Sequence, residues 1–381
     1  MIQRNSRGLE FAVTPVLNKS CHLFGIARCS YLTRTGKMAA SAAPCVTLTR
    51  MNNSLKMASC HGSVWNAFVQ VYELNKGKLK LVHERETDAG IKCCTFGASS
   101  LEDRHLACGD YNGKLAIYDL QRNDVAVWSA NAHKTIINAV DGLGGPDSTY
   151  GAPELVTGGR DGCVRVWDPR VSEAVVQLEP REGEFQTARD CWTVVFGNAY
   201  TDEDRCLAAG YDNGDVKLFD LRTQTMRWET NVKNGVTGLS FDRNDIEMNK
   251  LVVTTLESKF RTYDMRTQHP EAGFAHVSEK AHKSTVWLAR HLPQNRDLFM
   301  TGGGNGGFNL YKYHYPSSRT KDDKDHIPMG VAGQVELLNS RVISSQPIVS
   351  FDWSPDREGL CCLSCLDQTV RVYIVTKLGK F

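Results

Sequence analysis

Short runs of alternating apolar and polar residues recur seven times along the chain, and each run ends in an aromatic residue. In every run a polar residue stands six positions before the aromatic. An Asn-Gly or Asp-Gly pair followed by alternating β-branched residues, as at Asp161-Gly162, is typical of a tight turn that leads into a strand. The pattern therefore predicts a repeated β-hairpin. The aromatics are Tyr72, Tyr118, Trp167, Phe219, Tyr263, Tyr311 and Tyr373.

The spacing of these aromatics indicates the size of the repeated unit. Successive aromatics lie 46, 49, 52, 44, 48 and 62 residues apart, close to the roughly 40 to 45 residues of one four-stranded propeller blade. Turn residues and strand-like runs fill the intervals, and no long amphipathic helical stretch interrupts them. We therefore predict an all-β fold, a seven-bladed β-propeller.

The third unit carries further residues whose types and positions are informative. "NAHKTI" supplies His133, and "LVTGGRDGCVRVWDPR" supplies Thr157, Asp161 and Trp167. These residues resemble the WD-repeat family, whose units end in Trp-Asp. The resemblance implies a structural tetrad of His, Thr, Asp and Trp, in which buried polar groups satisfy one another and stiffen the blade. The unit with His282, Thr301, Asn305 and Tyr311 is the next best match.

The ends of the chain bear on how the ring closes. We expect residues 41–381 to form the propeller, with an insertion near 314–347, and residues 1–40 to form a separate basic segment. Only "TKLGKF" follows Val375, too little for an outer strand. A strand from residues 9–17 or 21–27 would then complete the last blade, although Pro15 disfavours the first choice. Alternatively, residues 1–37 are a translated leader or a transit peptide, or Met38 is the true start, in which case the closing strand would be missing.

Composition and charge narrow the range of possible functions. The net charge is +2; residues 1–37 hold six basic residues and one acidic residue, which leaves −3 for the rest. A nearly neutral body argues against nucleic-acid binding. No apolar run is long enough for a membrane helix. The 13 cysteines suit a reducing compartment. No second Cys or His pair accompanies Cys361, Cys362 and Cys365, so we expect no metal.

The turns of a propeller offer side chains that packing does not require. When the seven repeats are aligned, one set of residues lies immediately before the turn. A second set lies where the chain begins a new blade, near the same rim of the disc. Aromatic and Arg side chains at such positions make good interface anchors, although the two Trp residues could equally be core. The candidate partner-binding residues are Tyr111, Arg160, Asp190, Trp192, Asp212, Lys283 and Trp287.

Longer segments narrow the resemblance within the WD-repeat family. "IKCCTFGASSLEDRHLACGDYNGKLAIYDL", "RDCWTVVFGNAY" and "SEKAHKSTVW" resemble axonemal dynein assembly factors. The resemblance implies a non-enzymatic cytoplasmic adaptor without a cofactor, and a role in apoptosis has also been attached to the family. The implied partners are RuvB-like ATPases, a tetratricopeptide RNA polymerase II-associated co-chaperone subunit, prefoldin-like subunits and dynein chains as clients.

Two other functions deserve weight. "VWDPR", echoed by "FDLR" and "YDMR", resembles the WDxR element of substrate receptors for cullin-type ubiquitin ligases, although Asp followed by Arg is frequent among WD repeats. An enzyme is the second alternative, because "GGGNGG" (302–307) looks suited to phosphate. That segment does not lie between a strand and a helix, as a nucleotide-binding loop must. We therefore expect no catalytic residues.

Overall fold

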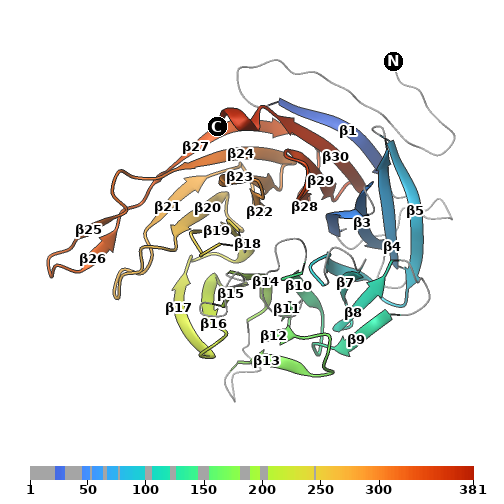
Figure 1. Ribbon diagram of the computed structural model, residues 1–381, viewed down its shortest axis with the longest axis horizontal. Coiled ribbons are helices and arrows are strands. Elements are labelled where there is room, and N and C mark those ends of the chain that lie inside the picture. The colour runs from blue at the N-terminus through green and yellow to red at the C-terminus, as the bar shows by residue number, and fades with distance from the viewer. Residues whose placement is uncertain are drawn as a thin grey trace.

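The computed structural model confirms a seven-bladed β-propeller, in which four-stranded antiparallel sheets surround a central axis (Figure 1). It describes residues 22–30, 45–51, 54–62, 67–75, 78–98, 105–120, 126–144, 154–180, 189–197, 205–243 and 246–381. These residues contain no α-helix, and no helix among them is long and apolar enough to cross a membrane.

The first four blades follow one another along the chain. Blade 1 contains β2 (Cys45–Met51), β3 (Ser54–Gly62), β4 (Ala67–Asn75) and β5 (Lys78–Thr87). Blade 2 contains β6 (Ile91–Thr95), β7 (His105–Asp110), β8 (Lys114–Asp119) and β9 (Ala126–Asn131). Blade 3 contains β10 (Ile137–Gly142), β11 (Leu155–Gly159), β12 (Val164–Trp167) and β13 (Ala174–Leu178). Blade 4 contains β14 (Cys191–Phe196), β15 (Cys206–Tyr211), β16 (Asp215–Asp220) and β17 (Thr225–Asn231).

The last three blades include an inserted hairpin and a strand from the N-terminal region. Blade 5 contains β18 (Val236–Phe241), β19 (Lys250–Thr255), β20 (Lys259–Asp264) and β21 (His276–Lys280). Blade 6 contains β22 (Val286–Leu292), β23 (Asn295–Gly303), β24 (Gly307–His314) and β27 (Gln334–Val342). Blade 7 contains β28 (Ile348–Trp353), β29 (Leu360–Cys365), β30 (Thr369–Thr376) and β1 (His22–Ser30), and the short 3₁₀ helix η1 (Leu378–Lys380) follows it.

The repeated aromatics all lie in the third strand of a blade, which explains their regular spacing. Where the structure describes the turn before that strand, it has a left-handed glycine in four blades, with φ of 77° at Gly162. Glycine adopts this conformation without strain because it has no Cβ. The opening Asp-Gly pair of the WD unit is therefore the tight turn between β11 and β12.

The hydrophobic core lies between the blades. The described residues form seven buried apolar clusters, and each joins two neighbouring blades. Blades 3 and 4, for example, share a cluster that contains Val156, Val164, Val194 and Phe196. Because each blade buries both faces against its neighbours, the ring resists deformation as a unit.

The ring closes through the N-terminal strand. β1 pairs antiparallel with β30 from His22–Thr376 to Ser30–Thr369, with one register shift between Gly25 and Ala27. Of the two segments considered from the sequence, residues 21–27 therefore overlap the closing strand, whereas 9–17 lie outside the described residues. The propeller thus includes residues 22–30 and begins before the boundary expected at residue 41.

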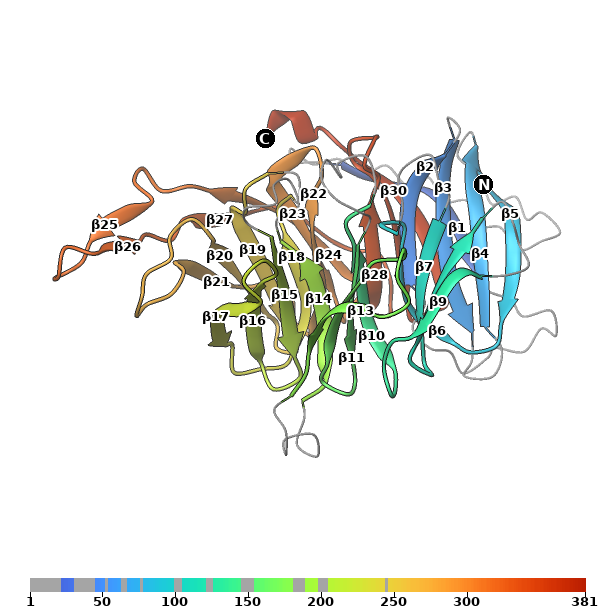
Figure 2. The same cartoon turned by 60° about the horizontal axis from the view of Figure 1, so that its bottom comes forward.

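The long interval before the last aromatic contains a projecting hairpin. β25 (Thr320–Asp322) pairs with β26 (Pro328–Gly330), and the two strands extend beyond the rim of the disc (Figures 1 and 2). β27 returns to pair with β24 as the outer strand of blade 6. The extra residues are therefore those between His314 and Gln334, a shorter segment than the expected 314–347. We call residues 315–333 the arm.

Candidate functional site

The four predicted tetrad residues form a continuous chain of hydrogen bonds in blade 3. Trp167 Nε1 donates to Thr157 Oγ1 over 2.9 Å. Thr157 Oγ1 lies 2.9 Å from His133 Nε2, and His133 Nδ1 lies 2.8 Å from Asp161 Oδ1. Because Trp167 donates, the chain is satisfied when Thr157 donates to Nε2 and the Nδ1–H of His133 donates to the carboxylate.

The surroundings of Asp161 keep its carboxylate ionised. Burial alone would raise its pKa, but hydrogen bonds from His133 and from the backbone of Lys134 and Cys163 outweigh burial and lower the pKa. Arg165 adds a positive charge 3.5 Å away. Thr157 has no solvent exposure. A substrate therefore has no access to the hydroxyl, and the group stiffens the blade rather than forming a nucleophile and base.

Blade 6 keeps part of this arrangement. His282 Nε2 lies 2.8 Å from Thr301 Oγ1, and burial lowers the pKa of His282 to about 4. Asn309 takes a role of its own, since its side-chain amide donates to the carbonyl of Ala281 and to the hydroxyl of Tyr311. His282 is therefore a neutral, buried structural group at neutral pH.

Cys93 and Cys163 show no features of reactive thiols. Burial raises the pKa of Cys93 to about 12 and that of Cys163 to about 11, so both thiols stay protonated and weakly nucleophilic at neutral pH. Successive residues of a strand point to opposite sides. Cys361 therefore faces blade 6, whereas Cys362 faces blade 1.

Among the described residues, one backbone hydrogen bond recurs in six blades and defines a face of the disc. The residue after the second strand donates its N–H to the carbonyl just before the first strand, over 2.8 to 3.0 Å. We call this face, with its turns between second and third strands, the entry face. Tyr111, Arg160 and Asp212 occupy equivalent places on it. The six donors are Tyr111, Arg160, Asp212, Leu256, Gly304 and Leu366.

A β-bulge on the first strand of blades 2 to 7 determines the direction of the Trp192 and Trp287 side chains, which belong to the second set of candidates. In each of these blades the pairing skips the second residue of the strand, and a bulge re-aims the side chain it leaves unpaired. Two bulge residues bind the next blade: Asn138 donates to the carbonyl of Cys191, and Thr237 donates to that of Val286. Trp192 and Trp287 occupy the same position and are half-buried, so each contributes both to packing and to the surface.

The structure brings four of the seven candidates together between blades 3 and 4. Arg160 lies 3.6 Å from the carboxylate of Asp190, and the Asp212 N–H donates to the carbonyl of Asp190 over 3.0 Å. The Trp192 side chain donates a hydrogen bond to Asp190. Burial raises the pKa of Asp190, and the nearby Asp212 raises it further, against the opposing effect of Arg160. We call these four residues the blade 3–4 cluster.

The other candidates lie apart from that cluster. Tyr111 is half-buried in blade 2, and burial raises its pKa. Lys283 is exposed in the connection from β21 to β22. A Cβ added at Gly304 would lie 3.4 Å from Trp287 Nε1, so this indole lines the turn after β23. The candidate residues therefore form separate groups on the entry face rather than one continuous cluster.

Two exposed apolar residues on this face did not emerge from the sequence. Leu256 and Leu366 are each 38% exposed, and both follow the second strand of a blade, as Tyr111 and Arg160 do. Leu256 and Trp192 both border Gly235, which extends the blade 3–4 cluster with an apolar edge. Extending the repeat frame to every blade would have identified both leucines.

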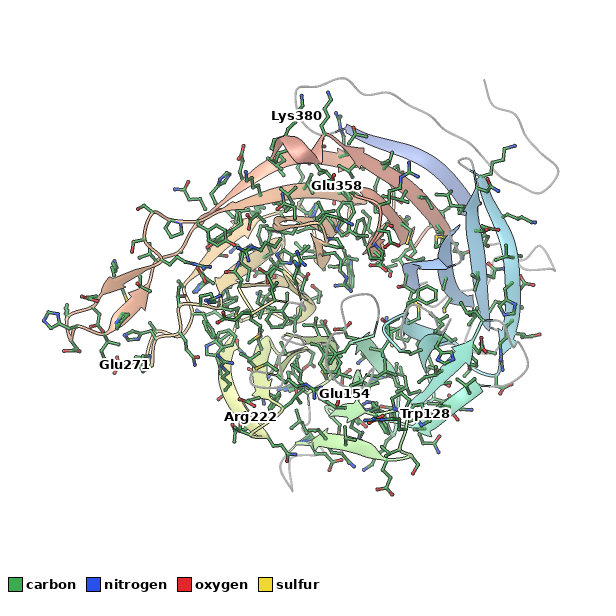
Figure 3. All side chains as sticks on the ribbon, viewed as in Figure 1. Trp128, Glu154, Arg222, Glu271, Glu358 and Lys380 are labelled. Atoms are coloured by element: carbon green, nitrogen blue, oxygen red, sulfur yellow. The ribbon has the colours of Figure 1, made fainter. Side chains whose placement is uncertain are left out.

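The arm is fixed to blade 5 by partly buried polar contacts. Arg319 binds the carboxylate of Asp264, and His269 Nε2 lies 3.1 Å from Asp323. His269 Nδ1 accepts hydrogen bonds from the backbone of Glu271 and Ala272. Glu271 itself points from the neighbouring loop beside the arm (Figure 3). The arm is therefore an ordered projection.

Comparisons with known proteins agree with these features. The family model of the WD domain, G-beta repeat, matches residues 125–168, which include the tetrad. The chain is 60% identical over 313 residues to dynein axonemal assembly factor 10 of Homo sapiens and 59% identical over 313 residues to that of Xenopus tropicalis. It is 56% identical over 314 residues to that of Chlamydomonas reinhardtii. Each alignment covers 82% of this chain and 87% of the relative. The chain therefore belongs to the dynein axonemal assembly factor 10 family of WD-repeat proteins, and the resemblance predicted from its sequence is confirmed.

Proposed function

We propose that this chain is a non-enzymatic adaptor that links a co-chaperone assembly to dynein chains during their cytoplasmic preassembly. The observation that carries the proposal is the high identity to dynein axonemal assembly factor 10 over most of the chain. The expected partners are RuvB-like ATPases, prefoldin-like subunits and a tetratricopeptide co-chaperone subunit. Dynein chains are the expected clients.

The architecture supports a role through contact. Seven shared cores produce a stiff disc, and a surface that is already rigid loses little conformational entropy when a partner binds. The residue types of the tetrad could suggest a catalytic relay, but His133, Thr157 and Trp167 are buried. "GGGNGG" forms the hairpin between β23 and β24, so its glycines serve a turn between strands.

The blade 3–4 cluster is the part of the entry face that we assign to the partner. Arg160 and Trp192 are residue types enriched among energetic anchors of interfaces. Asp212 Oδ1 is buried and has no hydrogen-bond partner within the described residues, and a buried polar atom without a partner costs about 1 to 3 kcal/mol. Because that oxygen is inaccessible, a partner would contact the Arg160 side chain instead, which is 60% exposed.

Affinity purification from ciliated cells tests the proposal. We would compare the unaltered chain with Arg160→Glu, Trp192→Ala and a deletion of residues 318–326. Arg222→Glu is the matched control, because Arg222 is exposed in a turn at the opposite ends of the strands of blade 4 (Figure 3). We expect Arg160→Glu or Trp192→Ala to reduce recovery of RuvB-like ATPases and dynein heavy chain at least about tenfold, which corresponds to ~1.4 kcal/mol. Equal recovery by these variants, with unchanged circular dichroism, would refute the assignment of this face.

The ubiquitin-ligase alternative gains little from the structure. Arg170 of the WDxR element binds Asp168 of the same element with Nε and Nη2, so the pair already has a role in the turn after β12. Recovery of the damaged-DNA-binding adaptor of cullin ligases, in place of the RuvB-like ATPases, would favour this alternative.

A further inference from the structure

Two cross-strand cysteine pairs face each other between blades 1 and 2. Cys45 pairs with Cys60 in the register of β2 and β3. Cys94 pairs with Cys108 in the register of β6 and β7. All four thiols are free of disulfides, and three of the residues belong to the apolar cluster that joins the two blades, with Cys94 packed against it.

Three of these four sulfur atoms gather around one point. The Sγ atoms of Cys45, Cys60 and Cys94 all lie within 4.8 Å of one another, and those of Cys45 and Cys94 are 2.7 Å apart. The Cys108 thiol forms a side-chain hydrogen bond with Cys60. Cys60 has no exposed surface, and Cys45 is only 7% exposed. The group is therefore enclosed, with Cys94 as its most accessible member.

The strand register shows why these sulfurs meet. Cys60 occupies the position of blade 1 that corresponds to Gly158 in blade 3, three residues beyond the partner of the repeated aromatic. A Cβ at Gly158 would lie 2.7 Å from Cys191 Sγ and 2.8 Å from Val194 Cγ1 of the next blade. A side chain at this position therefore points directly at the next blade. The equivalent residues of three other blades are also glycines, Gly109, Gly210 and Gly302.

The partner of Cys60 across the interface also departs from the repeat. Cys94 corresponds to Val140 in blade 3 and to Val194 in blade 4, each of which is the fourth residue of its first strand. Blade 1 thus has a thiol where blades 2, 3, 4 and 6 have glycine and blades 5 and 7 have the hydroxyl residues Thr254 and Ser364. Blade 2 has a thiol where two other blades have valine. Packing alone does not require either sulfur, because the other interfaces are filled without them.

Among the described residues, no carboxylate or imidazole joins this group of sulfur ligands. Such a set favours thiophilic cations such as Zn²⁺ or Cu⁺. With Zn–S bonds of about 2.3 Å, a tetrahedral site separates its sulfurs by roughly 3.8 Å. That separation fits within the observed group, provided that Cys45 and Cys94 move apart by about 1 Å. We propose that Cys45, Cys60 and Cys94 bind one thiophilic cation of the Zn²⁺ class, with Cys108 as the fourth thiol, and that this cation links blades 1 and 2. The proposal is independent of the adaptor function.

Metal analysis of the purified full-length chain tests this site. We expect about one zinc per chain by mass spectrometry after expression with zinc and dialysis without chelator. Cys60→Gly and Cys94→Val each introduce the residue that other blades use, and we expect them to lower bound zinc at least about tenfold. Cys206→Ala, a buried cysteine in blade 4, is the matched control and should keep its zinc.

X-ray absorption of the zinc-loaded unaltered chain gives a second test that needs no variant to fold. We expect a first shell of three or four sulfurs at about 2.3 Å, and a thiolate-to-metal charge-transfer band when Co²⁺ replaces zinc. Zinc in a shell of nitrogen and oxygen, a chain without stoichiometric metal, or a Cys45–Cys94 disulfide found by peptide mapping would each overturn the proposal.

Discussion

Arg319 of the arm binds Asp264 of blade 5 with two hydrogen bonds, of 2.9 Å from Nε and 3.0 Å from Nη2. The Asp264 side chain is fully buried, whereas Arg319 is one-third exposed. The planar guanidinium matches both carboxylate oxygens, a geometry that lysine cannot reproduce. This contact holds the base of the projection seen in Figure 2.

Replacing Arg319 should therefore loosen the arm. Arg319→Ala leaves a buried carboxylate without its cation, and we expect the free energy of unfolding to fall by about 2 kcal/mol. Hydrogen exchange of residues 265–275 and 318–331 should become faster. Lys321→Ala, an exposed change on the same arm, is the control. Equal protection in both variants would show that the ion pair does not hold the arm.

Thr157 should be the most sensitive member of the tetrad. Its hydroxyl serves both Trp167 and His133, so Thr157→Val leaves two buried polar atoms without partners while the side-chain shape is kept. We expect a loss of about 3 kcal/mol in the free energy of unfolding, measured by urea denaturation. Thr225→Val, at an exposed position, should change stability little. A loss below about 0.5 kcal/mol in Thr157→Val would mean that the chain of hydrogen bonds adds no stability.

Acid should weaken the propeller in two successive ranges. The pKa of His282 falls from an unfolded value near 6.5 to about 4. The unfolded chain then binds more protons, and the stability due to neutral His282 is complete above pH 6.5 and declines down to about pH 4. The pKa of Asp161 is also lowered, so its contribution is complete above its unfolded pKa of about 3.9 and is lost at still lower pH.

Urea denaturation at pH 7.0, 5.5 and 4.5 measures the first range. Between pH 6.5 and pH 4, the free energy of unfolding of His282→Gln should decline by about 3 kcal/mol less than that of the unaltered chain. His314→Gln, at a side chain that is 45% exposed, should leave the decline as it is. An identical pH profile for His282→Gln and the unaltered chain would assign the acid sensitivity to other groups.

Loss of β1 should open the ring. A chain that begins at residue 31 lacks the partner of β30, and an uncovered strand edge invites pairing between molecules. We expect a lower melting temperature and concentration-dependent association by size-exclusion chromatography. A chain that begins at residue 21 keeps β1 and is the matched control. Identical melting of the two truncations would show that β1 does not close the ring.

The sequence by itself determined the repeat. The aromatic six residues after a polar turn residue identified the third strand of all seven blades, and His133, Thr157, Asp161 and Trp167 were recognisable as one set. Such patterns are readable because strand alternation and tight turns depend on neighbouring residues. The sequence also indicated that Tyr111, Arg160 and Asp212 share a face.

Only the tertiary structure decided which side chains meet across blades. Arg160 with Asp190, Arg319 with Asp264, and Cys45 with Cys94 are 30, 55 and 49 residues apart. Even the closing pair of β1 and β30 joins residues more than 300 positions apart. Periodicity carries no information about these contacts, because they depend on how far each strand slides and twists against the next blade. That geometry is set by the collective packing of seven interfaces.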